Sequence, residues 1–147
     1  TTGDGQKEIL VSAIKSKSDK QDYNDVRIYV LQQVKIGEIQ KWKSPYVGEV
    51  FENIIIEDIN KDGKIEIVAF AISGNMETID VFAWDGSVYK EIFNNGAKGG
   101  IEIKDIDGDG IKEILLKGTG YGSSTENYIH KWDGEKYYFY KTEKTKT

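Results

Sequence analysis

One acidic pattern occurs three times along this chain, and such an internal repeat constrains the fold more than any other sequence feature. Its aspartates, Asp4, Asp62 and Asp109, are 58 and 47 residues apart. The copies read Gly3-Asp-Gly-Gln-Lys-Glu-Ile-Leu10, Lys61-Asp-Gly-Lys-Ile-Glu-Ile-Val68 and Gly108-Asp-Gly-Ile-Lys-Glu-Ile-Leu115. We therefore treat the 147 residues as a single domain of three repeats, at about residues 1–50, 51–99 and 100–147.

A second signature follows the acidic pattern in two of the copies. It reads Phe82-Ala-Trp-Asp-Gly-Ser-Val-Tyr89 and His130-Lys-Trp-Asp-Gly-Glu-Lys-Tyr137. An Asp-Gly dipeptide suits a two-residue hairpin turn, because both central positions need positive φ. Each repeat is thus predicted to contain a strand, the acidic loop, a second strand, a connection, a third strand, a tight turn and a fourth strand.

The β-branched and aromatic runs between these turns favour the pleated sheet over a helix. The predicted strands are Lys7–Ile14, Val26–Gln33 and Glu38–Trp42 in the first repeat, Ile54–Glu57, Glu66–Ile72, Thr78–Trp84 and Val88–Phe93 in the second, and Gly100–Lys104, Glu113–Lys117, Glu126–Trp132 and Lys136–Lys141 in the third. The first repeat lacks an opening strand. Tandem four-stranded units of about 45–50 residues are typical of a β-propeller, so the prediction is an all-β chain of four-stranded antiparallel blades. Three stacked hairpins in a sandwich are the alternative.

The acidic loops Asp58–Glu66 and Asp105–Glu113 have the composition of calcium sites. Oxygen-bearing side chains occupy positions 1, 3, 5 and 9, and glycine occupies position 6. Calcium takes six to eight oxygen ligands, and acids at alternate positions of a tight loop converge on one point. The predicted ligands are Asp58, Asn60, Asp62, Glu66 and the carbonyl of Lys64 in one loop, and Asp105, Asp107, Asp109, Glu113 and the carbonyl of Ile111 in the other.

These loops are not EF-hands, because Ala69 and Leu116 stand at position 12, where an EF-hand has its closing glutamate. The alternative is an Asp-rich and Gly-rich turn without a metal, but three or four converging carboxylates repel one another unless a cation neutralises them. Magnesium suits the loops less well, since it demands octahedral geometry. Having four acids against three, the Asp105 loop is expected to bind calcium more tightly. The first repeat keeps only Asp4 and Glu8, and no complete site is expected there.

At the residues of these two loops the sequence resembles the FG-GAP, or VCBS-type, repeat of the integrin α-chain β-propeller, which also occurs in many exported bacterial proteins. The resemblance extends over nearly the whole chain, although the Phe-Gly and Gly-Ala-Pro elements that name the repeat are poorly kept at Phe93–Lys98. It implies a propeller with calcium in the loop between the first two strands of a blade, a secreted or cell-surface location, and a binding role. Propellers of the family close with about six or seven blades. Three repeats therefore imply a piece of a longer protein, assembly of several chains, or openly packed sheets.

Composition excludes several partners and chemistries. The formal net charge is −5 and Arg27 is the only arginine, which argues against nucleic-acid binding. There is no cysteine, so disulfides and thiol catalysis are excluded. No apolar run reaches the roughly 18 residues of a membrane span.

Outside the acidic loops the candidate sites are weaker. His130 is the only histidine. A triad with Ser123 or Ser124 and Asp133 would lack a nucleophile elbow, so no catalysis is expected. The Gly-rich segments Gly118–Thr125 and Gly96–Gly100 are candidate carbohydrate-contacting loops or plain connections. The remaining candidates are aromatic: Trp84 and Trp132, predicted to pack between blades, and Tyr137, Tyr138 and Tyr140, predicted to line both faces of the last strand.

The sequence thus predicts a non-catalytic, calcium-stabilised binding module at the cell surface or outside the cell, with a protein or carbohydrate ligand. One alternative is an accessory domain of a secreted polysaccharide-degrading enzyme. Another is a structural or assembly domain that self-associates to complete the propeller, because an unpaired strand edge in the first repeat would favour association.

Overall fold

A computed structural model describes residues 8–15, 25–33, 38–118 and 126–144, which form eleven strands in three separate antiparallel sheets. The first sheet contains β1 (Glu8–Lys15), β2 (Asp25–Gln33) and β3 (Glu38–Lys43). The middle sheet contains β4 (Val50–Glu57), β5 (Glu66–Ser73), β6 (Met76–Trp84) and β7 (Tyr89–Ala97). The third sheet contains β8 (Ile101–Lys104), β9 (Glu113–Lys117), β10 (Glu126–Trp132) and β11 (Tyr137–Lys144).

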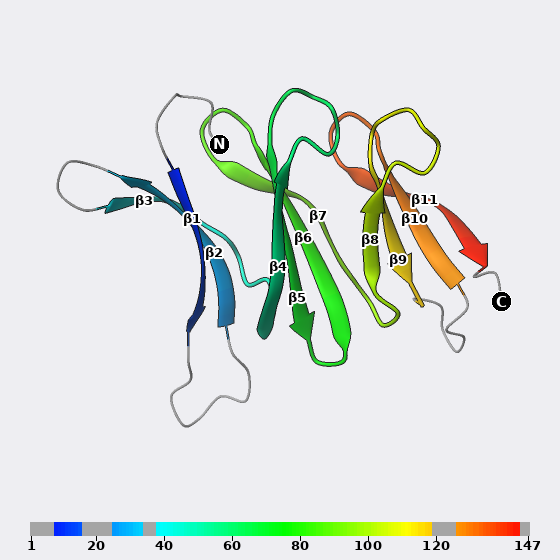
Figure 1. The fold of residues 1–147 in the computed structure, drawn as a ribbon, viewed down its shortest axis with the longest axis horizontal. Helices are drawn as coiled ribbons and strands as arrows, with labels where there is room; N and C mark the ends of the chain where they lie inside the picture. The colour runs from blue at the N-terminus through cyan, green and yellow to red at the C-terminus, as the bar shows by residue number, and fades with distance from the viewer. Residues whose placement is uncertain (1–7, 16–24, 34–37, 119–125, 145–147) are drawn as a thin grey trace.

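The prediction of an all-β chain with one sheet per repeat is confirmed. Neighbours along the chain are neighbours in each sheet, and the two four-stranded sheets share the predicted order of strand, acidic loop, strand, connection, strand, turn and strand. The first sheet has three strands, as its missing opening strand predicted. The two acidic loops lie at the same end of the sheets, joining β4 to β5 and β8 to β9 (Figure 1).

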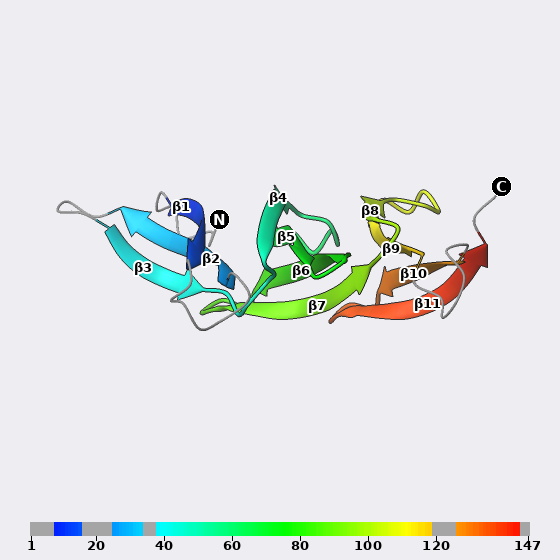
Figure 2. The same ribbon diagram turned by 90° about the horizontal axis from the view of Figure 1, so that it is seen from below.

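The middle sheet is packed between the other two, as the view from below shows (Figure 2). Side chains alternate across a strand, so β5 contributes to both interfaces. Its Ile67 and Ala69 join the cluster with the first sheet, and its Val68 and Phe70 join the cluster with the third sheet. All four are buried, and β5 is therefore the centre of the molecule.

The cluster between the first and middle sheets consists of Val26, Ile28, Val30, Trp42, Val47, Ile67, Ala69, Phe82 and Tyr89. The cluster between the middle and third sheets consists of Ile59, Val68, Phe70, Ile79, Val81, Phe93, Ala97, Ile114, Leu116 and Tyr137. Burial of these side chains at about 25 cal/mol per Å² is the main source of stability.

The predicted propeller is not confirmed, because the three sheets stand in an open row and do not close on themselves. The outward face of the third sheet is the face turned away from the middle sheet. The strand register shows how it differs from the equivalent face of the middle sheet, which packs against the third sheet. The pair Lys117 and Asn127 in the third sheet occupies the place of Phe70 and Ile79 in the middle sheet. Likewise Lys141 stands opposite Ile129, where the middle sheet has Phe93 opposite Val81. This outward face has therefore exchanged much of its apolar surface for charge.

Ion pairs cover that outward face. The Glu102 carboxylate is paired with the Lys117 ammonium and lies 2.9 Å from the Lys104 ammonium, and these two lysines lower the pKa of Glu102 to about 2. Lys141 pairs with Glu143 at 2.6 Å. Exposed pairs of this kind contribute little stability each. They nevertheless make the outward face of the third sheet hydrophilic.

Candidate metal centres

The two acidic loops share most of their internal hydrogen bonds, but only the Asp105 loop has one from the N–H at position 4, where Gly108 donates to Asp105 Oδ1 at 2.6 Å. The first aspartate accepts a bond from the glycine N–H five residues later, which is 3.0 Å long from Gly63 to Asp58 and 2.8 Å long from Gly110 to Asp105. The oxygens at positions 3 and 5 accept from the N–H two residues on, as Asp62 does from Lys64 and Asp109 does from Ile111, both at 2.8 Å. Asn60 and Asp107 make the equivalent bonds at position 3. The predicted alternate spacing therefore gives both segments the same kind of tight loop, in which the side-chain oxygens bond to the loop's own backbone.

The glycine at position 6 has the conformation that the prediction required. Gly63 has φ 84° and Gly110 has φ 86°, in the left-handed region where a side chain is strained. Position 4 is also left-handed in both loops, with Gly108 at φ 82° and Lys61 at φ 57°. The two backbones thus follow the same path even where the residue type differs.

The closing glutamates are buried and bind back to their own loops. Glu66 Oε2 accepts from the Ile59 N–H at 3.0 Å, and Glu113 Oε2 accepts from the Ile106 N–H at 2.7 Å. Burial raises the pKa of Glu66 to about 7, and the charges of Asp62 and Asp58 add to that rise. Carboxylates crowded in this way need a positive charge to remain ionised together.

The Asp58 loop contains buried oxygens without a hydrogen-bonding partner. Glu66 is fully buried, and its Oε1 accepts no bond; Asp58 Oδ1 is likewise buried and without a partner. A buried carboxylate oxygen that accepts nothing costs several kcal/mol, and a cation would remove that cost. The residues of this loop therefore fit a bound metal ion.

The Asp105 loop contains the tightest acidic group in the described part of the chain. One carboxylate oxygen from each of Asp105, Asp107 and Asp109 lies within 4.8 Å of the others, and all three residues are exposed. Hard oxygen donors at this spacing suit a divalent cation.

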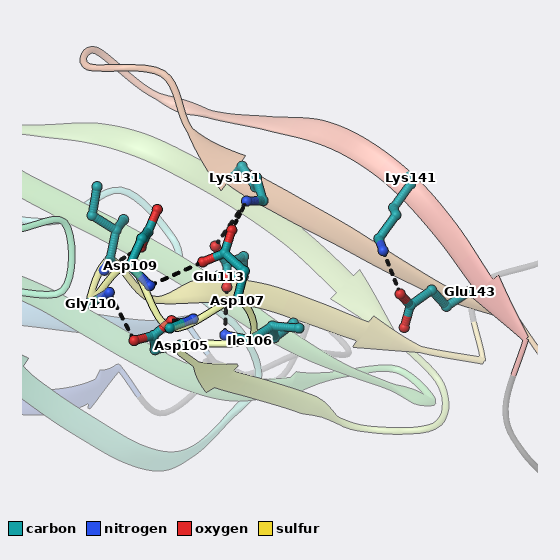
Figure 3. Close-up of polar contacts among 11 residues, drawn as sticks. Asp105, Ile106, Asp107, Asp109, Gly110, Glu113, Lys131, Lys141 and Glu143 are labelled. Atoms are coloured by element: carbon teal, nitrogen blue, oxygen red, sulfur yellow. Dashed lines mark hydrogen bonds and ion pairs between the residues drawn. The ribbon is translucent and has the colours of Figure 1, made fainter.

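A lysine from another strand also reaches the Asp105 loop (Figure 3). The Lys131 ammonium, from β10, is paired with Asp107 Oδ2 and lies 3.6 Å from Glu113 Oε1. This contact lowers the pKa of the Asp107 carboxyl. The sequence analysis missed Lys131, because it is 24 residues from Asp107 and no local pattern marks it.

The two loops touch each other. The Ile59 carbonyl of one loop accepts a 2.8 Å bond from the Lys112 N–H of the other, and the Lys112 ammonium lies 2.5 Å from Glu57. The Lys61 ammonium occupies the place that a Cβ on Gly110 would take. The loops therefore form one continuous acidic end of the stack.

His130 is a buried residue of the core, in agreement with its predicted role as an ordinary face residue. It packs edge-on against Phe93, with ring centroids 4.9 Å apart, and burial lowers its pKa. Asp133 caps the β10–β11 turn by accepting bonds from the Glu135 and Lys136 N–H groups at 2.9 Å each. The two candidate serines lie outside the described residues.

The tryptophans pack between sheets, as predicted. Trp84 contacts the cluster between the first and middle sheets, and Trp132 contacts the cluster between the middle and third sheets. Each lies against the tyrosine after its turn, with ring centroids 5.1 Å apart for Trp84 and Tyr89 and 5.4 Å apart for Trp132 and Tyr137. Tyr137 is therefore a core residue.

Exposed aromatic side chains gather on β11, at the edge of the third sheet. Tyr138, Phe139 and Tyr140 are 40–52% exposed. Of the three tyrosines predicted to line both faces of this strand, Tyr137 is buried, whereas Tyr138 and Tyr140 are exposed.

Most of the Gly118–Thr125 loop and Asp4 lie outside the described residues. The Gly96–Gly100 segment is a packed connection, because the Gly99 N–H donates to the Lys117 carbonyl at 2.9 Å. The described residues form no helix that could cross a membrane. Comparisons with protein-family models, with curated proteins and with solved structures found no match.

Proposed function

We propose that the two acidic loops bind calcium and that the chain is a calcium-stabilised, non-catalytic binding module. The observation that carries the proposal is the pair of buried, unpartnered carboxylate oxygens of the Asp58 loop, Glu66 Oε1 and Asp58 Oδ1. Asp62 and Asn60 would complete the side-chain ligands of this site, and the Asp105 loop would supply the second one. The carbonyls of Lys64 and Ile111 remain predicted ligands.

Calcium is the ion that this donor set favours. All the donors are carboxylate or amide oxygens, and the glutamate at position 9 comes from the start of a strand. Such a set adapts to six to eight bonds of 2.3–2.6 Å, whereas magnesium needs a regular octahedron at 2.0–2.1 Å. Affinities of about 10⁻⁴–10⁻³ M, typical of extracellular modules, are expected.

The binding role, the extracellular or cell-surface location and the membership of an FG-GAP-like propeller follow from the resemblance. Exposed Tyr138 and Tyr140 support a contact with a protein or a carbohydrate, because aromatic rings on an open edge suit both kinds of ligand. A glycan array probed with calcium-loaded protein would test the carbohydrate ligand, with Tyr140→Ala as the variant expected to lose binding.

Thermal unfolding of metal-free protein, with and without calcium, tests the metal sites. Calcium at about 100 times its Kd should stabilise the chain by roughly 2.7 kcal/mol per site, because only the folded loops gather the ligands. Asp62→Asn and Asp109→Asn should each remove one site's share of the shift. Asp133→Asn, an equivalent change in a turn without predicted ligands, should keep the full shift.

Magnesium at the same concentration serves as the ion control. If calcium shifts the melting temperature of the unaltered chain no more than magnesium does, the acidic loops are turns and the proposal is wrong.

A further inference from the structure

The Asp105 loop is contacted by the ammonium of a lysine from another strand, and among the described residues no such ion pair reaches Asp58, Asp62 or Glu66. The Lys131 ammonium is paired with Asp107 Oδ2 and lies 3.6 Å from Glu113 Oε1, so it contacts two of the four predicted carboxylate ligands (Figure 3). Its side chain is 23% exposed, and its ammonium lies 5.0 Å from the centre of the Tyr140 ring. The ammonium is thus held against the loop by two carboxylates and a ring face.

The register shows that this lysine is an addition to the third repeat. Lys131 pairs with Tyr138 across the third sheet, one position before the Trp132–Tyr137 pair. In the middle sheet the same position is Ala83, paired with Lys90 beside the Trp84–Tyr89 pair. The ammonium that the middle sheet has beside this position, that of Lys90, pairs at 2.8 Å with Asp85 of the turn and not with the Asp58 loop.

The extra lysine accompanies an extra acid. Asn60 stands at position 3 of the Asp58 loop, where the other loop has Asp107. The three predicted carboxylate ligands of the Asp58 loop carry a formal charge of −3; the four of the Asp105 loop, taken with the Lys131 ammonium that contacts two of them, also sum to −3. Counting acids alone therefore overstates the attraction of the Asp105 loop for a divalent cation.

We propose that Lys131 is a tethered cation of the Asp105 loop, which neutralises Asp107 and Glu113 in the absence of calcium and competes with calcium for them. This inference rests on the proposed calcium binding. It reverses the expectation that the loop with four acids binds more tightly. It also gives the two loops different roles: the Asp58 loop depends on calcium, and the Asp105 loop is held in shape without it.

Calorimetric titration with calcium chloride tests the competition, with Asp62→Ala in all proteins so that only the Asp105 loop binds. Lys131→Met removes the charge and keeps the chain length, and Lys131→Gln is a second neutral variant in case the first folds poorly. Both should bind calcium about tenfold more tightly, the size expected for one charge held a few ångströms from a divalent ion near the surface. Lys131→Arg retains the charge and should keep the weaker affinity. Lys90→Met removes a lysine that pairs with Asp85 in the middle sheet, and it should leave the affinity unchanged.

Melting of the same proteins without calcium gives an independent readout. Loss of the tethered cation should lower the melting temperature of Lys131→Met in metal-free buffer, and calcium should raise it by more than it raises the parent. Equal calcium affinities with and without Lys131 would overturn the inference while leaving the proposed calcium sites intact. Absence of any calcium binding by the unaltered chain would overturn both.

Discussion

Lys61 has a left-handed backbone with φ 57°, whereas the Asp105 loop has a glycine, Gly108, at the equivalent position. A residue with a Cβ is destabilised by roughly 1–2 kcal/mol in this region, so replacing it by glycine relieves that strain. The greater flexibility of glycine in the unfolded chain offsets part of the resulting gain in stability. Lys61→Gly should therefore stabilise the metal-free protein by about 0.5–1 kcal/mol in urea unfolding. Lys64→Gly, an exposed lysine of the same loop, is the control and should not stabilise it. A loss of stability in Lys61→Gly would mean that the contact between its ammonium and Gly110 outweighs the strain.

Asp80 is a fully buried carboxyl between the first and middle sheets. It accepts a 2.5 Å bond from Asn94, its Oδ2 has no hydrogen-bonding partner, and burial raises its pKa from 3.8 to about 7, with the nearby charge of Glu91 adding to the rise. At a pH well below 3.8 the group is protonated in both states and costs nothing. As the pH rises to 7, the unfolded state loses the proton more readily, which destabilises the folded state by at most about 4 kcal/mol.

Asp80→Asn should remove this penalty, because the amide keeps an acceptor for Asn94 and carries no charge. Its stability relative to the unaltered protein should increase from pH 4 to pH 7 and then level off, as measured by urea unfolding at each pH. Asp133→Asn should instead lose stability relative to the unaltered protein as the pH rises towards about 4 and change little from pH 5 to pH 7, since bonds from the Lys136 and Glu135 N–H groups lower the pKa of Asp133. A pH-independent difference for Asp80→Asn would contradict the raised pKa.

At the scale of single residues, the sequence was informative where the determinants are local. The acids at alternate positions and the left-handed Gly63 and Gly110 follow from spacing within nine residues. Lys131 and Asp80 could not be predicted, because one acts across 24 residues of chain and the other depends on burial between two sheets.

At the scale of elements, β9 and β10 have the predicted bounds, and β4 and β7 are longer than predicted. The segments that were missed, residues 50–53 and 94–97, contain polar residues and a glycine that rank low in strand propensity. They pair nonetheless, because β5 and β6 offer them a complete edge. A bulge at Glu52 takes up one residue of the first segment, and residues 94–97 pair with β6 in regular register. Tertiary pairing therefore decided these ends, and local propensity did not.

Gly48 lies where the chain passes from the first sheet to the middle sheet. Its carbonyl accepts a 3.0 Å bond from the Val26 N–H, and a Cβ there would lie 2.5 Å from Ala71 Cβ and 3.0 Å from the Ile72 carbonyl oxygen. Gly48→Ala should therefore cost about 1–3 kcal/mol in urea unfolding, since backbone and core must move. Gly96→Ala should cost less, because its nearest neighbour is the flexible end of Met76. Equal losses of stability in the two variants would mean that the backbone at Gly48 can move away from Ala71 and Ile72 at little cost.

At the scale of the whole molecule, the repeat predicted three sheets and their sequential packing, but it could not predict whether the row would close. Closure depends on the faces at the two ends, and repeat alignment hides the difference between them. In the third sheet, Lys117, Asn127 and Lys141 replace the apolar side chains that the middle sheet offers its neighbour. A further sheet of the same kind would find little apolar surface there.

The double variant Lys117→Leu with Lys141→Phe should make this outward face apolar and cause the protein to self-associate. It restores two apolar residues and removes the ion pairs with Glu102 and Glu143. We expect light scattering after size exclusion to show a larger mass than for the unaltered chain at equal concentration, because exposed apolar sheet faces associate. The control exchanges two other exposed lysines for the same two residues: Lys90 of β7 and Lys98 of the connection after it. An unchanged mass would mean that the charged side chains are not what prevents association through this face.

The strand β5 is hydrogen-bonded to a neighbouring strand on each edge, and its two faces are both covered. It contributes four buried side chains, two to each core cluster. No other strand of the described chain contributes as many to the two clusters together while joining both. In a row of units that contact only their neighbours, loosening an outer unit breaks one interface, whereas loosening the central unit breaks two. The molecule should therefore come apart from its ends. Amide protons of the outer sheets should exchange with solvent through partial openings, and those of β5 should exchange only when the whole row unfolds.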